Sequence, residues 1–173
     1  MSPPQASQRS LHHWDKTLEA YFSDIQLVGE IPVTPADIDE LGVHLRALLR
    51  RSNVNEIKEQ FARHRYTWMT YMAAVAARND DLGYWDALGQ TLGVTGAELQ
   101  RAGLGNAFLT TARALGLSHF AEAGGYRYVT PIRLHGGIPA YSLPDFFEHI
   151  LLPAAQVPEY ADMAVDEIIV SML

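Results

Sequence analysis

Hydrophobic residues recur along most of the chain with the three-to-four-residue spacing of an amphipathic helix. The first such stretch runs from Leu11 to Leu27 and follows Ser10, whose hydroxyl suits the N-cap position. A second stretch runs to about Arg51 and begins at Thr34 and Pro35, a capping residue followed by a proline that is tolerated in the first helical turn. The pattern therefore predicts two helices in the first part of the chain.

Three further helices are predicted in the middle of the chain. The longest apolar stripe runs from about Asn55 to Arg78, and a shorter one runs from Tyr84 to Leu92 and ends at Gly93. Thr95 is followed three residues later by a glutamate, which is the spacing of a capping box. We expect the helix that it opens to continue to Gly116.

The helical spacing stops between Ala123 and Tyr141, where four glycines and two prolines surround aromatic and β-branched residues. This composition predicts a small β-hairpin or extended loop near residues 126–138. Helical spacing returns from Ser142 to Pro153 and from Val157 to Leu173. The predicted fold class is all-α, or α-dominated: a bundle of about 6–7 helices with one small hairpin or loop.

The length of 173 residues is typical of one domain, and we expect a disordered tail at 1–10 followed by a single helical domain at 11–173. The absence of cysteine excludes disulfides and thiolate zinc sites. Residues 1–10 lack the apolar stretch of a signal peptide, and no run elsewhere approaches about 20 apolar residues, so we expect a cytoplasmic protein with no membrane partner. The apolar stretch before Leu173 lacks a helix-stop signal, which indicates the N-terminal module of a longer protein or a docking tail.

Charge is unevenly distributed along the chain, whose net charge is −7. Residues 44–65 hold six basic and two acidic residues, whereas residues 140–173 hold six acidic and no basic residues. The basic segment is either balanced by acidic segments within the fold or free to contact an anionic partner such as nucleic acid. In the second case, the candidate nucleic-acid-binding residues are Arg46, Arg50, Arg51, Lys58, Arg63 and Arg65.

No complete catalytic, cofactor or metal motif is present. Leu134 to Gly137 is similar to the His-Gly-Gly turn that supplies backbone donors to an oxyanion in lipase-like hydrolases, but a Gly-x-Ser-x-Gly elbow is missing. A small hydrolase around His135 is therefore only an alternative. No two histidines have the i, i+4 spacing that places two imidazoles on one helical face. We expect no cofactor and no metal.

The segments GYRYVTPIRLHGGIP (Gly125–Pro139) and YSLPDFF (Tyr141–Phe147) resemble a region near the N-terminus of large bacterial proteins associated with anti-phage defence or mobile elements. The resemblance implies the front module of a larger machine whose catalytic parts lie downstream, and it implies no catalytic residue here.

The leading hypothesis is a non-catalytic interaction module that binds a protein partner or downstream domains of the same chain. Its predicted interaction loop contains Arg133, His135, Gly136, Gly137 and Tyr141. At least one of the two glycines is expected to have a positive φ.

Overall fold

The computed structural model describes residues 10–78, 83–119 and 128–137, and every regular element in these ranges is a helix. The all-α prediction is confirmed for this part of the chain. The chain divides into two units, Met1–Gly137 and Ile138–Leu173, and all described residues belong to the first. The helices predicted after Ser142 and Val157 lie outside the described residues, and the single domain predicted at 11–173 stays a prediction.

The first three elements are α1 (Leu11–Glu19), the 3-10 helix η1 (Val28–Glu30) and α2 (Pro35–Leu49). The Ser10 hydroxyl accepts a hydrogen bond from a backbone amide in the first turn of α1, as predicted. Thr34 caps α2 through a reciprocal pair of hydrogen bonds with the third residue of that helix. Because α1 ends at Glu19, the helix predicted to reach residue 27 is shorter than expected.

The helix predicted from Asn55 to Arg78 is instead two helices, α3 (Val54–Arg63) and α4 (Arg65–Arg78). They are separated by His64, whose φ of −128° and ψ of 43° are not helical. A carboxylate from α1 caps the second helix, because Asp15 Oδ1 accepts a hydrogen bond from the Thr67 amide at 3.0 Å. A contact from outside the segment therefore supports the second helix start.

Three short helices follow, namely α5 (Tyr84–Leu92), α6 (Gly96–Arg101) and α7 (Leu104–Ala114). The helix predicted to run from the capping box at Thr95 to Gly116 is divided between α6 and α7. The division lies at Gly103, which has a left-handed φ of +74°. Gly116 has a φ of +72° just beyond α7, so the predicted end of the segment is confirmed.

The predicted hairpin or extended loop is wrong for residues 129–136, which form helix α8 (Val129–Gly136). Val129 and Ile132 are buried in the core, and α8 packs mainly against α4. Helical hydrogen bonds satisfy the backbone within the segment, whereas a strand would need a partner strand, and the described residues contain none. Burial against α4 therefore outweighs the local preference of the aromatic and β-branched residues.

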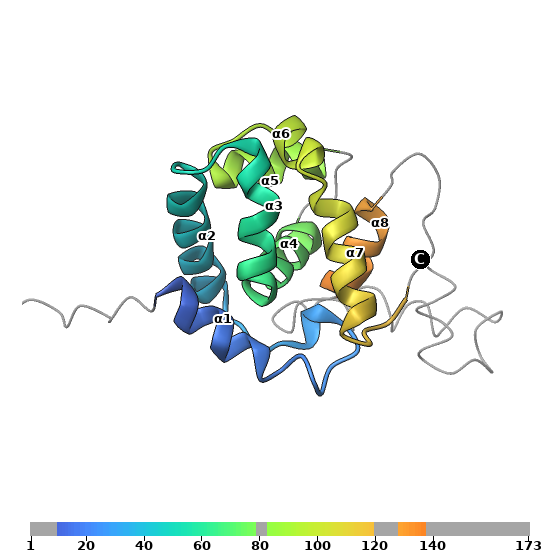
Figure 1. Ribbon diagram of the computed structural model, residues 1–173. Coiled ribbons are helices and arrows are strands. Elements are labelled where there is room, and N and C mark those ends of the chain that lie inside the picture. Colours follow the sequence, from blue (N-terminus) through green and yellow to red (C-terminus); the bar gives the residue numbers. More distant parts are fainter. Residues whose placement is uncertain (1–9, 79–82, 120–127, 138–173) are drawn as a thin grey trace, which may run out of the picture. The chain divides into compact units, whose positions relative to one another are not determined.

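Helix α4 is the centre of the unit (Figure 1), and it packs against α1, α2, α3, α5, α8 and η1. Its side chains are buried almost all the way round, and Trp68, Met69 and Met72 are completely inaccessible. A helix that is hydrophobic on every side must be surrounded by other elements. The remaining helices form this layer, and the candidate site lies on it.

Candidate nucleic-acid interface

The six basic residues predicted to contact nucleic acid lie at the C-terminal end of α2, along α3 and at the first residue of α4. All of them except the half-buried Arg46 are exposed. Arg46 and Arg65 make specific contacts within the protein and are described first.

Arg46 is a structural residue. Its guanidinium Nε donates a hydrogen bond to the Thr91 carbonyl oxygen at 2.8 Å, and Nη2 donates to the same oxygen. Thr91 lies in the last turn of α5, where carbonyl groups have no partner within the helix. The contact therefore completes the end of α5 and holds the C-terminal end of α2 beside it.

Arg65 is engaged with its neighbour Tyr66. Its guanidinium lies 4.8 Å from the centre of the Tyr66 ring, and Nη2 donates a hydrogen bond to the Tyr66 hydroxyl at 2.8 Å. The hydroxyl in turn donates to Glu19 Oε1 at 3.1 Å. This chain links the start of α4 to the end of α1, so the charge of Arg65 is partly balanced by a carboxylate of the protein.

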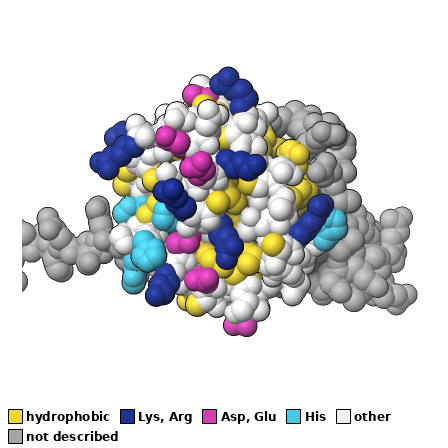
Figure 2. Space-filling model, in the orientation of Figure 1, with side chains coloured by type: hydrophobic (Ala, Val, Ile, Leu, Met, Phe, Trp, Pro, Cys, Tyr) yellow, Lys and Arg dark blue, Asp and Glu magenta, His cyan; other side chains and the backbone are white. Residues whose placement is uncertain are grey.

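The exposed cations do not gather into one dense patch. Figure 2 shows Lys and Arg side chains spread over one face with Asp and Glu side chains between them. On α3, Lys58 and Arg63 share the helix with Glu56 and Glu59. Binding of nucleic acid along the whole basic segment stays a prediction, and the structure shows that Arg46 and Arg65 are engaged within the protein.

A tight turn between α5 and α6 lies beside the end of α2. Gly93 closes α5 with a φ of +75° and a ψ of 29°, a conformation that favours glycine. Two residues later, the Thr95 hydroxyl accepts a hydrogen bond from the Glu98 amide at 3.2 Å, and Glu98 Oε2 accepts one from the Thr95 amide at 2.8 Å. The turn between the two helices is thus Gly93, Val94 and Thr95.

The two helices meet through their backbones. A Cβ added to Gly89 would lie 2.7 Å from the Gly96 nitrogen, and one added to Gly96 would lie 2.6 Å from the Trp85 carbonyl. Larger side chains would force the helices apart, so these glycines determine how closely α6 crosses α5. This glycine pair was not predicted, although the glycines at 89, 93 and 96 next to a capping box are visible in the sequence.

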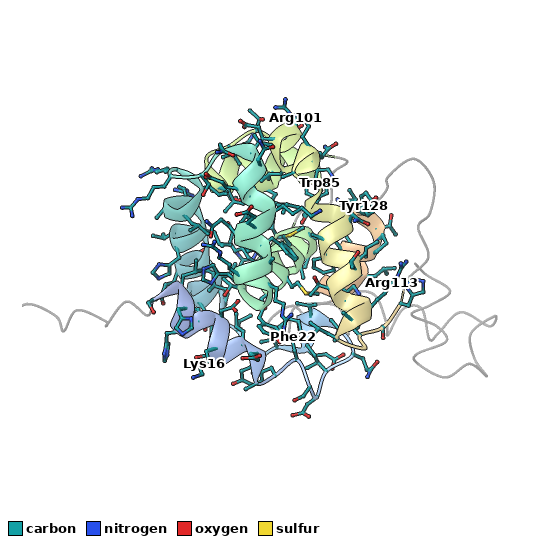
Figure 3. The ribbon with its side chains drawn as sticks, in the orientation of Figure 1. Lys16, Phe22, Trp85, Arg101, Arg113 and Tyr128 are labelled. Atoms are coloured by element: carbon teal, nitrogen blue, oxygen red, sulfur yellow. The ribbon has the colours of Figure 1, made fainter. Side chains whose placement is uncertain are left out.

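One side of α6 faces solvent. Ala97, Gln100 and Arg101 are exposed, whereas Leu99 is completely buried. Figure 3 shows Arg101 at the outer end of the unit. Hydrogen bonds from the Thr95 amide and hydroxyl hold the pKa of Glu98 below its usual value, so this carboxylate is ionised at neutral pH.

The residues of the predicted interaction loop lie elsewhere. Arg133, His135 and Gly136 are on helix α8, not in a loop, and Tyr141 lies outside the described residues. Gly137 follows the helix with a φ of +59°, which confirms the predicted positive φ. His135 and Gly136 are buried, so neither is available to a partner in this conformation.

His135 is a core residue. It is 1% exposed, and its ring centroid lies 5.5 Å from that of Phe108. Burial lowers the pKa of His135 to about 4, although a hydrogen bond to the Ser118 backbone partly opposes this shift. A general base must be within reach of its substrate, so the packing of this imidazole gives the hydrolase alternative no support.

The described residues contain no cluster of three or more His, Asp or Glu side chains that could hold a metal ion. None of the helices that the structure describes has the length and apolarity needed to cross a membrane.

Comparison of the chain with protein-family models, curated proteins and solved structures finds no match. The resemblance to bacterial anti-phage defence proteins therefore stays a prediction, and function must be argued from the geometry of the described unit.

Proposed function

We propose that this chain is a non-catalytic interaction module whose partner is nucleic acid. The observation that carries the proposal is a set of three exposed arginines, here called the basic end, which consists of Arg50, Arg51 and Arg101. The first two follow Arg46 at the end of α2, and Arg46 fixes this end against the last turn of α5. The third, Arg101, is the last residue of α6, the helix that follows the α5–α6 turn.

The exposed surface of the described residues favours a phosphate partner over a protein partner. The only large hydrophobic side chains exposed there are Tyr21 and Val43. Protein interfaces are centred on buried aromatic and apolar residues, which this surface largely lacks. Phosphate contacts need exposed cations, which the basic end supplies.

Salt dependence of binding tests the proposal. The full chain is titrated into a fluorescent 30-base-pair DNA duplex, and the dissociation constant is measured between 50 and 200 mM salt. Three phosphate contacts predict a slope of about −2.7 in a plot of log K against log salt, or a loss of about 40-fold in affinity over this range. Absence of binding at 50 mM salt would contradict the proposal.

A triple variant with Arg50, Arg51 and Arg101 replaced by Gln should bind more weakly to every duplex and show a flatter slope. Lys16→Gln is the matched control, because Lys16 is an exposed cation of α1 and lies on the opposite side of the unit from Arg101 (Figure 3). Arg46 is left intact because its loss would disturb α5. Equal slopes for the triple variant and the parent would refute the role of the basic end.

The distribution of charge between the two units favours a second candidate function, protein docking. Met1–Gly137 contains thirteen basic and fourteen acidic residues, whereas Ile138–Leu173 contains no basic and six acidic residues. An acidic segment attracts a basic protein surface. If the chain is the front part of a larger defence protein, that surface belongs to a downstream domain. Co-purification from the native host, weakened by Asn and Gln substitutions at Asp162, Asp166 and Glu167, would support docking, and unchanged recovery would refute it.

A further inference from the structure

The α5–α6 pair consists of a nine-residue helix, a three-residue turn that begins with a glycine, and a second helix whose outer side is exposed. Two helices joined by a three- or four-residue glycine-containing turn are the frame of a helix-turn-helix. We infer that α5 and α6 bind duplex DNA in this way, with α6 in the major groove. The inference rests on the proposed function and names the partner as double-stranded DNA.

The core of the unit holds α6 rigidly enough for this role. Leu88 and Leu92 of α5 and Leu99 of α6 are completely buried, so both helices are fixed to the hydrophobic core by their inner sides. The backbone contact between Gly89 and Gly96 sets their separation. A helix that reads DNA must keep its position when it enters the groove, and α6 also packs against α3 and α7.

The exposed side of α6 carries side chains suited to base edges. Gln100 has an amide that can pair with the N6 and N7 groups of adenine, and Arg101 has a guanidinium that can pair with O6 and N7 of guanine. Ala97 lies one turn before Arg101 on the same side and has a methyl group that can contact a thymine methyl. Two adjacent polar groups on a helix of six residues predict a short recognition site.

The charges beside α6 are mixed, because Asp86, whose carboxylate lies next to Gly96, and Glu98 are acidic, whereas Arg101 is basic. The Glu98 carboxylate is held by the Thr95 amide and hydroxyl at the start of α6, so its hydrogen-bonding oxygen is directed to the protein. Arg50 and Arg51 are exposed at the end of α2, which Arg46 joins to the last turn of α5, and in this inference they contact the phosphates that flank the groove. On a selected site, Arg50 and Arg51 keep their phosphate contacts, which position the protein. Arg101 exchanges the phosphate that it contacts on other duplexes for a base, and it supplies the sequence preference together with Gln100.

Selection from a randomised duplex tests this division of roles. The full chain is mixed with 30-base-pair duplexes that have a randomised centre, bound DNA is amplified, and affinities for the selected and a scrambled duplex are compared. We expect the selected duplex to bind more tightly, and Gln100→Ala or Arg101→Ala to reduce this preference by about 10-fold each. Arg101→Lys keeps the charge but loses the paired hydrogen bonds, so it should reduce the preference with little loss of affinity for the scrambled duplex.

Three outcomes separate this inference from the proposed function. Salt-dependent binding without any enriched sequence, or an unchanged preference in Gln100→Ala and Arg101→Ala, would overturn the helix-turn-helix assignment and leave the nucleic-acid partner in place. Equal affinity for a duplex RNA of the selected sequence would also overturn it, because the deep, narrow major groove of A-form RNA does not admit a helix. Absence of salt-dependent binding to any of these duplexes would refute both proposals. Far-UV circular dichroism of each variant checks that it folds.

Discussion

Gly136 of α8 lies against the backbone of α4, and replacing it with alanine should destabilise the described unit. An added Cβ would lie 2.6 Å from the Ala73 carbonyl oxygen and 3.2 Å from the Ala77 Cβ. The oxygen belongs to the backbone of α4 and cannot rotate away as a side chain would. Helix α8 must therefore move outward by roughly half an ångström or more, which separates atoms that are now closely packed.

The size of the effect follows from two opposing contributions. Overpacking of a buried contact costs about 1–3 kcal/mol. Alanine recovers at most about 1 kcal/mol of helix propensity relative to glycine, and less at the last residue of a helix. The free energy of unfolding of Gly136→Ala should therefore be lower than that of the parent by about 1–2 kcal/mol.

Urea unfolding, followed by tryptophan fluorescence, measures this difference. Gly83→Ala is the matched control, because a Cβ there meets nothing within 4 Å and the φ of −89° is accessible to alanine. Its free energy of unfolding should stay within about 0.5 kcal/mol of the parent value. If Gly136→Ala is as stable as Gly83→Ala, then α8 does not pack on α4 as closely as described.

Three further predictions concern side chains of the unit. Arg46→Ala should lower the free energy of unfolding by about 1.5–3 kcal/mol, because it leaves the Thr91 carbonyl without its charged donor. Urea titration measures this difference, and an unchanged midpoint would contradict the prediction. Asp15→Ala should cost about 1 kcal/mol by removing the acceptor for the Thr67 amide, whereas Asp15→Asn, which keeps an acceptor, should cost less in the same assay. Burial lowers the pKa of His135 from 6.5 to about 4, so between these pH values the unfolded chain binds more protons than the folded protein. The free energy of unfolding should therefore fall by up to about 3 kcal/mol as the pH drops through this range. Urea midpoints measured from pH 4 to 7 should show this slope in the parent and a flatter one in His135→Gln.

Helix ends with local signals were predictable from the sequence. Ser10, Thr34 and Thr95 cap the helices that the pattern assigned to them, and Gly93 and Gly116 end helices with positive φ. These signals are local: a cap side chain accepts hydrogen bonds from backbone amides, and a glycine adopts the positive φ that ends a helix, within a few residues of its own position. The same local information places the α5–α6 turn, although its glycine contacts were overlooked.

The features that sequence reasoning missed depend on distant contacts. The break at His64 has no glycine or proline, and the second helix start is supported by Asp15, which is 52 residues from its partner Thr67. The helix at residues 129–136 replaces the predicted hairpin because Ile132 and Val129 are buried and α8 packs on α4. The sequence pattern groups Arg46 with the residues predicted to bind nucleic acid, because its acceptor, a carbonyl 45 residues away, is not visible in the sequence.

Three distant parts of the chain approach one another closely through main-chain atoms at Gly29 and Gly136. The Gly136 carbonyl oxygen faces Gly29 of η1, and Gly136 itself faces the Ala73 carbonyl oxygen of α4. Peptide groups have no rotamers, so this junction cannot adjust by exchanging one side-chain arrangement for another. Segments joined in this way separate together rather than singly, and their amides should exchange with solvent only when the whole unit opens. The junction therefore makes η1, α4 and α8 one cooperative element, although they come from the beginning, middle and end of the described chain.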